Sequence, residues 1–229
     1  MSQIAQQIAQ VQQRIQQAAT LAGRAADAIQ LLAVSKTQPL DRIQAAIAAG
    51  QFAFGESYVQ EAIPKIEALA DLPAHIEWHF IGPIQSNKTM AIAEHFSWVH
   101  SVDRLKIAQR LSAQRPAHLP KLNVCIQVNI SGEASKSGVN VQALPELVRA
   151  IQGLAGLRLR GLMTIPAPST DPQAQRRPFA ALRQCMHDLN TQGADLDTLS
   201  MGMSRDLEAA IAEGATIVRV GTDIFGARA

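Results

Sequence analysis

The stretch IQLLAVSKTQP, residues 29–39, decides how this chain folds. It opens with a short apolar run, which is typical of a buried strand, and its Pro39 suits the first turn of a following helix. Lys36 stands between these two segments. The stretch therefore predicts a lysine at the carboxyl end of the first strand of a β/α repeat, with its amine directed into the mouth of the fold.

The rest of the chain repeats this alternation of strand and helix. Apolar runs that predict strands lie near residues 30–35, 51–54, 76–81, 98–101, 123–130, 158–164, 196–200 and 217–220. Helical spacing of apolar residues occurs near residues 39–49, 57–69, 86–95, 103–114, 141–152, 173–191 and 204–213. This alternation predicts a parallel sheet with right-handed crossovers, closed into a (β/α)8 TIM barrel, which is a fold of about 250 residues.

A further helical pattern, over residues 3–22, precedes the first strand. We therefore expect a single α/β domain over residues 1–229, with an extra N-terminal helix within residues 1–25. A doubly wound open sheet is the alternative fold. It would normally place a glycine-rich phosphate turn after the first strand, where this chain has Lys36 and its polar neighbours.

Glycines and short polar residues mark several predicted helix ends. Gly50, Gly193 and Gly214 fall where C-terminal caps are expected, because glycine adopts a positive φ without steric cost. Asp103 and Ser204 suit N-caps, whose side-chain oxygens accept from the free N–H groups of a helix.

The composition argues against several classes of function. The formal net charge is +2 and aromatic residues make up 4%, without the basic stripe that nucleic-acid or membrane binding requires. No apolar run reaches the roughly 20 residues that span a bilayer, and the first residues lack the order of a signal peptide. Cys125 and Cys185 are interpreted as reduced core thiols. We expect a cytoplasmic protein, monomeric by default, with no nucleic-acid, membrane or metal partner.

Two turns near the end of the sequence have the composition of an anion cradle: Ser200-Met201-Gly202-Met203-Ser204 and Gly221-Thr222. Their glycines let the backbone approach a phosphate closely, and their hydroxyls can donate. Barrels usually bind phosphate after the seventh and eighth strands, and the eighth neighbours the first on closure. Cradle and Lys36 should therefore meet, which predicts an aldehyde that carries a phosphate; pyridoxal 5′-phosphate (PLP) fits. The alternatives are a solvated strand-end lysine and a simple N-cap at Ser204.

Two interior residues are further candidates for this site. Arg219 lies on an apolar strand, where an inward charge needs a partner, and its guanidinium could face the pyridine nitrogen of PLP. An ion pair with Asp223 or Glu56 is the alternative. His79 alternates with apolar neighbours and could lie near the ring, although a core histidine satisfied by hydrogen bonds is the competing interpretation.

Two loops receive weaker predictions. Residues 164–175 are rich in proline, which forbids both helix and strand ladder, and predict a flexible rim of the mouth. Residues 135–138, with the sequence SKSG, could form an anion site after the fifth strand, although such a run is usually a solvated turn.

Several segments in a fixed order carry a family resemblance. They are LAVSKT (32–37), FGESYVQE (54–61), WHFIGPIQSNK (78–88), VNI (128–130), SKSG (135–138), RGLMTIP (160–166), LSMGMS (199–204) and RVGTDIFG (219–226). Through them the chain resembles the pyridoxal phosphate homeostasis proteins, also described as YggS-like or proline synthase co-transcribed homologues.

The resemblance implies a barrel like the N-terminal domain of alanine racemase, similar to fold type III of PLP enzymes but without the C-terminal β domain. It implies that Lys36 holds PLP as a Schiff base, that the Ser200 turn and Gly221-Thr222 hold the phosphate, and that Arg219 faces the ring nitrogen. One position departs from the family, which commonly has asparagine where this chain has Ser57. We carry over no contact there.

The resemblance also implies a function in vitamin B6 homeostasis, namely binding, buffering or delivering PLP to PLP-dependent apo-enzymes, without robust catalysis. Racemisation in such barrels needs a second base, supplied as a tyrosine by an added β domain. This chain stops soon after its eighth predicted strand, and its only tyrosine is Tyr58. Two alternatives stay open: a weak PLP-dependent amino-acid racemase or lyase, and a barrel enzyme whose lysine forms a Schiff base with a keto substrate.

Overall fold

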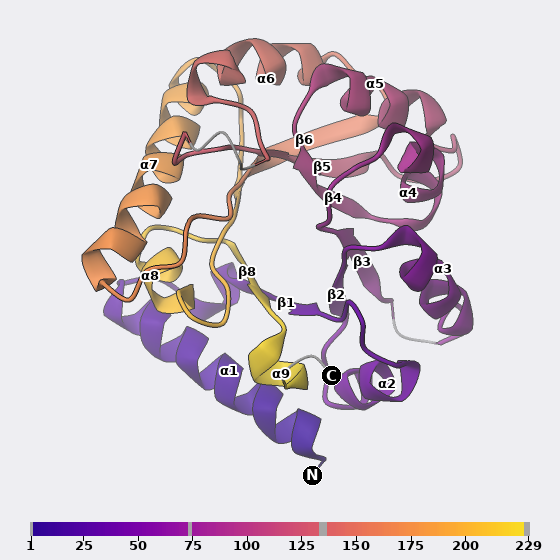
Figure 1. Cartoon of the computed structure of the whole chain (residues 1–229), viewed down its shortest axis with the longest axis vertical. Helices are drawn as coiled ribbons and strands as arrows, with labels where there is room; N and C mark the ends of the chain where they lie inside the picture. Colours follow the sequence, from indigo (N-terminus) through magenta and orange to yellow (C-terminus); the bar gives the residue numbers. More distant parts are fainter. Residues whose placement is uncertain (1, 73–74, 133–136, 227–229) are drawn as a thin grey trace.

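The computed structural model describes residues 2–72, 75–132 and 137–226. Within these ranges eight parallel strands close into a barrel (Figure 1). The strands are β1 (Gln30–Val34), β2 (Ala53–Glu56), β3 (Glu77–Phe80), β4 (Trp98–Val102), β5 (Leu122–Gln127), β6 (Leu157–Met163), β7 (Thr198–Ser200) and β8 (Ile217–Val220). Each strand pairs with the next, and β8 pairs with β1 to complete the ring. The predicted (β/α)8 barrel is confirmed, and the open sheet is excluded.

Helices surround the strands on all sides in Figure 1. They are α1 (Gln3–Leu21), α2 (Leu40–Ala48), α3 (Val59–Ala68), α4 (Thr89–His95), α5 (Leu105–Gln114), α6 (Leu144–Gln152), α7 (Pro172–Thr191), α8 (Leu207–Ala212) and α9 (Thr222–Phe225). Short 3-10 turns occur at η1 (Ala26–Ala28), η2 (Ser86–Lys88) and η3 (Val141–Ala143). The pattern agrees with the predicted alternation, including a short last helix.

The boundaries of β2 differ from the prediction of residues 51–54. Gln51 lies outside the strand because its buried side-chain amide donates to the carbonyl oxygens of Leu31, at 2.9 Å, and Ala53, at 2.7 Å. At its other end the strand continues to Glu56, since Gly55 pairs with Val34 of β1. The acidic residue that a sequence-based reading would assign to a loop is therefore part of the sheet.

The predicted helix ends are partly confirmed. Gly50, Gly193 and Gly214 each follow a helix and have φ of 86°, 85° and 96°, as expected of left-handed glycine caps. Asp103 is not an N-cap, because α5 begins after Arg104. The Asp103 carboxylate instead accepts from the Arg104 guanidinium at 2.6 Å.

The buried side chains divide into two groups. An apolar outer layer lies between strands and helices and holds most of the core, including Phe54, Phe80 and Phe179. A second cluster gathers side chains from strands that face one another across the ring, so it fills the barrel interior: Leu32, Ala53, Trp98, Cys125, Met163 and Ile217. Both cysteines are free, as predicted, and burial raises the pKa of Cys125 to about 12.

Helix α1 is the predicted N-terminal addition to the barrel. Its apolar stripe, which includes Ile8, Val11 and Ile15, is buried, and it packs against α8 and α9 (Figure 1). Its Arg14 donates to the carboxylates of Glu208 in α8 and Asp223 in α9, at 2.7 Å and 2.5 Å. The helix thus holds together the two elements that follow the predicted cradle turns.

Candidate functional site

The end of β1 and the turn after β8 meet at one edge of the barrel mouth. The two strands pair in parallel, with Ala33 opposite Val220. A Cβ built on Gly221 would lie 3.3 Å from the Cβ and from the carbonyl oxygen of Val34. Lys36 follows Val34 by two residues. The structure thus brings the end of β1, which leads to Lys36, against the predicted Gly221 turn, although these segments lie near opposite ends of the chain.

Lys36 follows the carboxyl end of β1. The ladder continues past the strand to Ser35, whose N–H donates to the Gly55 carbonyl oxygen at 3.0 Å. Side chains alternate along a strand, and Leu32 belongs to the interior cluster, so the alternation continued as far as Lys36 predicts the side of Leu32 for its side chain. The lysine is partly exposed, whereas Ser35 is fully buried. This exposure suits an amine that must meet a ligand from solvent.

The turn after β7 depends on Gly202. This residue has a φ of 92°, and a Cβ there would lie 2.6 Å from the Cβ of Ala210 in α8, so glycine is required. Its carbonyl oxygen accepts from the Arg219 N–H at 2.9 Å, which ties the turn to β8. Met201, another predicted site residue, has its side chain buried in the outer layer. The turn after β7 therefore lies beside β8, the strand that leads to the Gly221 turn.

The helix after this turn begins later than predicted. The N-cap of α8 is Asp206, so the prediction of Ser204 as N-cap is wrong. The reason is a tight turn in which Asp206 Oδ1 accepts from the Met203 N–H at 2.6 Å. The Ser204 carbonyl oxygen accepts from Arg14 at 2.9 Å. Ser204 is partly exposed and Thr222 is exposed, and their contact with a phosphate stays a prediction.

Arg219 lies inside the barrel below the Gly221 turn. Its guanidinium donates to Ser200 Oγ at 2.7 Å and to the Thr164 carbonyl oxygen at 2.9 Å. The alternative ion pairs do not form, because Asp223 binds Arg14 and Glu56 binds Lys65. Burial lowers the pKa of Arg219 to about 10, so the side chain remains a cation near neutral pH.

Buried side chains continue from Arg219 across the interior. His100 Nδ1 lies 2.7 Å from Ser200 Oγ, and His100 Nε2 lies 2.9 Å from His79 Nδ1. Arg219 can only donate to Ser200 Oγ, which leaves the proton of the serine hydroxyl available to His100 Nδ1. Among the described residues His79 Nε2 is buried without a hydrogen-bond partner, and the Glu77 carboxylate lies 3.6 Å from it. We call His79, His100, Ser200 and Arg219 the interior chain.

The electrostatics of the interior chain agree with neutral imidazoles. Burial lowers the pKa of His79, and burial together with nearby His79 and Arg219 lowers the pKa of His100 well below its usual value. The proximity of His79 is the main reason that the pKa of Glu77 falls to about 2. The interior chain therefore begins at the Arg219 guanidinium and ends at His79, 3.6 Å from the Glu77 carboxylate.

Some participants were foreseen from the sequence and others were not. His79 and Arg219 were predicted to face the interior, and both do. Ser200 was predicted as a phosphate donor, but both of its hydrogen-bonding partners are interior groups. His100 and the Thr164 carbonyl were missed; the alternation of Trp98 and His100 along β4 is the signal that could have found the second histidine.

The remaining sequence-based candidates lie around the mouth. Ser57 is buried, and its carbonyl oxygen would clash with a Cβ at Gly82, 2.2 Å away, so these two segments are in close contact. In the loop at 135–138, residues 135 and 136 lie outside the described ranges. Its Ser137 carbonyl oxygen accepts from Gln127 at 3.2 Å. Residues 164–170 are irregular, as predicted, but the prediction of a loop as far as residue 175 is wrong, because α7 begins at Pro172, and proline is tolerated in the first turn of a helix.

Within the described ranges, no His, Cys, Asp and Glu side chains gather in a group of three or more that could hold a metal ion. None of the helices in those ranges combines the length and apolarity needed to cross a bilayer.

The fold and the lysine-bearing mouth define a class of protein. Residues 6–229 match the family of the alanine racemase N-terminal domain. An alanine racemase from Corynebacterium glutamicum superposes with a TM-score of 0.68 at 18% identity, covering 94% of this chain and 59% of that enzyme, which is a likeness of fold. The chain is thus a barrel of the alanine racemase N-terminal type.

Within this class the chain belongs to the pyridoxal phosphate homeostasis proteins. It is 63% identical to the protein of that name from Pseudomonas aeruginosa, covering 100% of this chain and 97% of the relative. It is 54% identical to that of Escherichia coli K12, covering 100% and 98%. The structure of PipY from Synechococcus elongatus with PLP bound has a TM-score of 0.83 at 37% identity, covering 98% of this chain and 100% of PipY.

Proposed function

We propose that this chain binds PLP as a Schiff base with Lys36 and serves to buffer and deliver the cofactor in vitamin B6 homeostasis. The observation that carries the proposal is the contact of the Gly221 turn with the end of β1. It supports a mouth at which a primary amine, a glycine turn and the cationic end of the interior chain would meet. The names of the relatives and the PLP-bound PipY structure support the same ligand.

The residues of the mouth suit the three parts of PLP. Lys36 would supply the amine that reacts with the aldehyde. The phosphate would lie on the two glycine turns, held by Gly202, Ser204, Gly221 and Thr222. Arg219 would face the pyridine nitrogen, and because a guanidinium only donates, it would keep that nitrogen unprotonated. When bound, PLP supplies an aldehyde and an electron-accepting ring, and an unprotonated ring accepts electrons poorly.

The proposal includes the absence of robust catalysis. Racemisation requires a base on each face of the bound substrate. The chain's single tyrosine, Tyr58, is 49% exposed and precedes α3, outside the interior. His79 and His100 are hydrogen-bonded to each other, and His100 also binds Ser200. These interior groups support Arg219 and are not available as a second base.

The competing function is weak racemase or lyase activity on a small amino acid. The fold likeness to alanine racemase favours it. Incubating the PLP-loaded protein with amino acids in deuterated water separates the two, because a racemase or lyase must exchange the α-hydrogen. We expect no exchange above that of free PLP.

Delivery implies transient partners, and we propose that these are PLP-dependent apo-enzymes that meet a monomer. Mixing the loaded protein with an apo-enzyme and a PLP-trapping competitor tests this directly. Delivery predicts reactivation that resists the competitor. Reactivation at the rate set by free PLP would indicate buffering alone.

The test of binding is the absorption spectrum of the protein titrated with PLP. The wild-type protein should develop the band of a lysine Schiff base, and Lys36→Ala should not. Lys88→Ala is the matched control, since Lys88 also follows a strand but lies in η2. An unchanged spectrum in Lys36→Ala would remove the proposed site, and a keto substrate in place of PLP would be revealed by a different adduct mass.

A further inference from the structure

A strained four-residue turn carries Lys36. The turn spans Ser35–Gln38 and is closed by the Gln38 N–H, which donates to the Ser35 carbonyl oxygen at 3.0 Å. Its third residue, Thr37, has a φ of 63°. A β-branched residue rarely adopts positive φ, and such strain persists only where surrounding contacts impose it. Lys36 therefore lies in a turn that must be held from outside.

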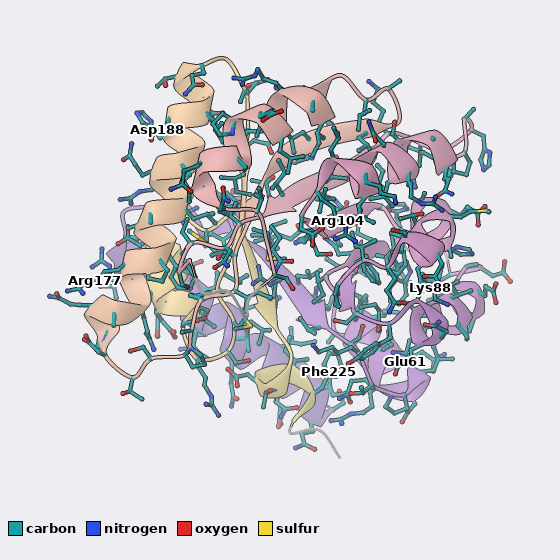
Figure 2. The ribbon with its side chains drawn as sticks, turned by 45° about the horizontal axis from the view of Figure 1, so that its top comes forward. Glu61, Lys88, Arg104, Arg177, Asp188 and Phe225 are labelled. Carbon is teal, nitrogen blue, oxygen red and sulfur yellow. The ribbon has the colours of Figure 1, made fainter. Side chains whose placement is uncertain are left out.

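Helix α3 provides the contacts that hold this turn. Lys65 Nζ donates to the Ser35 carbonyl oxygen at 3.0 Å, and Glu61 Oε2 accepts from the Thr37 N–H at 3.0 Å. The first group belongs to the peptide bond before Lys36, and the second to the peptide bond after it. Glu61 and Lys65 are four residues apart, so they lie on one face of the helix. Figure 2 labels Glu61 on α3.

Lys65 is itself held by a buried carboxylate. Its Nζ lies 2.8 Å from Glu56 Oε1, which also accepts from Ser35 Oγ at 2.7 Å. Glu56 is fully buried, and Lys65 has only 12% of its side chain exposed. Because the carboxylate lies at the end of β2, it fixes the ammonium against the end of β1. If Lys65 moved away, the buried Glu56 carboxylate would be left without its ion-pair partner.

We propose that Glu61 and Lys65 are positioning residues for Lys36: they hold both peptide groups that flank it and keep its amine directed into the mouth. The proposal rests on the proposed function, in which that amine forms the Schiff base. The orientation of the peptide between Lys36 and Thr37 depends on the positive φ of Thr37. Without Glu61 this peptide turns over, Thr37 relaxes to negative φ, and the Lys36 side chain leaves its alignment.

Glu61 offers the cleaner set of variants, because it is exposed and its removal leaves the buried Glu56–Lys65 pair intact. Glu61→Ala removes the acceptor, and Glu61→Gln keeps an oxygen that can accept from Thr37 N–H. Glu67→Ala changes another exposed glutamate of α3 and serves as the control. Losing one hydrogen bond to a charged, exposed group predicts an effect of about five- to tenfold.

The first measurement is amide hydrogen exchange of residues 35–38 without PLP. Glu61→Ala should speed exchange of the Thr37 amide about five- to tenfold, while Glu61→Gln and Glu67→Ala leave it near the wild-type rate. Equal exchange in all four proteins would overturn the proposal. Because no ligand is involved, this result stands even if the chain proves not to bind PLP.

The second measurement separates positioning from general damage. Glu61→Ala should lower the equilibrium constant for Schiff-base formation about five- to tenfold, but should leave the non-covalent affinity for PLP unchanged in a Lys36→Ala background. Weaker binding in that background as well would assign Glu61 a merely structural role. Failure of the wild-type protein to form any adduct would instead contradict the proposed function.

A third variant tests the strain directly. Glycine adopts positive φ freely, so adding Thr37→Gly to Glu61→Ala removes the conformational preference that Glu61 opposes. The double variant should regain most of the lost Schiff-base formation. If it remains as impaired as Glu61→Ala alone, then strain at Thr37 is not what the helix restrains.

Discussion

The outer layer and the interior of this barrel are built on opposite principles. Between strands and helices most of the buried groups are apolar, with the Glu56–Lys65 pair as an exception, and large side chains such as Phe179 are fully enclosed. Inside the ring, apolar residues share the space with the interior chain, from Arg219 through Ser200 and His100 to His79. Burial of apolar area stabilises the first region, whereas the second depends on each polar group having a partner.

This difference predicts how substitutions in each region should affect stability and PLP binding. A barrel whose strands are anchored from outside by apolar packing can carry polar groups inside without losing its fold. The interior can then be specialised for a ligand. Truncations of the outer layer should therefore reduce stability and spare the ligand, and changes to the interior chain should affect both.

The largest expected effect is that of emptying the outer layer. Phe179→Ala in α7 removes a fully buried ring and should lower the free energy of unfolding by about 3–5 kcal/mol. Urea denaturation measures this loss. At temperatures where the variant is folded, its dissociation constant for PLP should equal that of the wild type. A marked loss of affinity would mean that the two regions are coupled.

A smaller loss of stability is expected from breaking the interior chain. Ser200→Ala leaves an Arg219 N–H and His100 Nδ1 without their partner, which should cost about 1–3 kcal/mol. PLP affinity should also fall, because Arg219 loses one of its two acceptors. Thr198→Val is the control: it removes a hydrogen bond to Asp197 at the other end of β7. The PLP affinity of the Thr198→Val variant should equal that of the wild type.

The smallest effect concerns pH. Burial lowers the pKa of His79 and His100 in the folded chain, so below their unfolded value of about 6.5 the unfolded state binds more protons. The free energy of unfolding should then fall with falling pH, by at most about 1.4 kcal/mol per pH unit for each group. Glu77, with a pKa of about 2, titrates below this window.

The comparison that isolates this effect is His100→Gln, whose amide can still bind both neighbours. Glu56 titrates in the opposite sense, because burial raises its pKa and the folded state holds that proton longer. Its contribution is common to both proteins and cancels in the difference. His100→Gln should lose less stability than the wild type between about pH 7 and about pH 5.5. Parallel curves would mean that His100 is not held neutral.

The fold could be predicted from the sequence because the spacing of apolar residues within each segment indicates a strand or a helix. The apolar run before Lys36 and its repeats along the chain gave the barrel, and glycines such as Gly50 marked helix ends. Boundaries were missed where a side chain competes with the backbone. Gln51 uses its amide to replace strand bonds, and Asp206 closes a turn that delays α8.

The site could be predicted only in part. Lys36 and the two glycine turns lie at strand ends, where barrel topology alone brings them together. The partners of Arg219 could not be found this way, since Ser200 belongs to β7 and Thr164 follows β6, and they meet Arg219 only in the folded ring. The contacts of Lys65 with Ser35 likewise depend on how α3 packs beside β1.

The most direct measurement is to reduce the PLP-loaded protein with borohydride and locate the added pyridoxyl mass by peptide mapping. The account predicts one labelled site, Lys36, and no label on the corresponding peptide of Lys36→Ala. A pyridoxyl group on another lysine, or none on any peptide of the loaded wild-type protein, would contradict it.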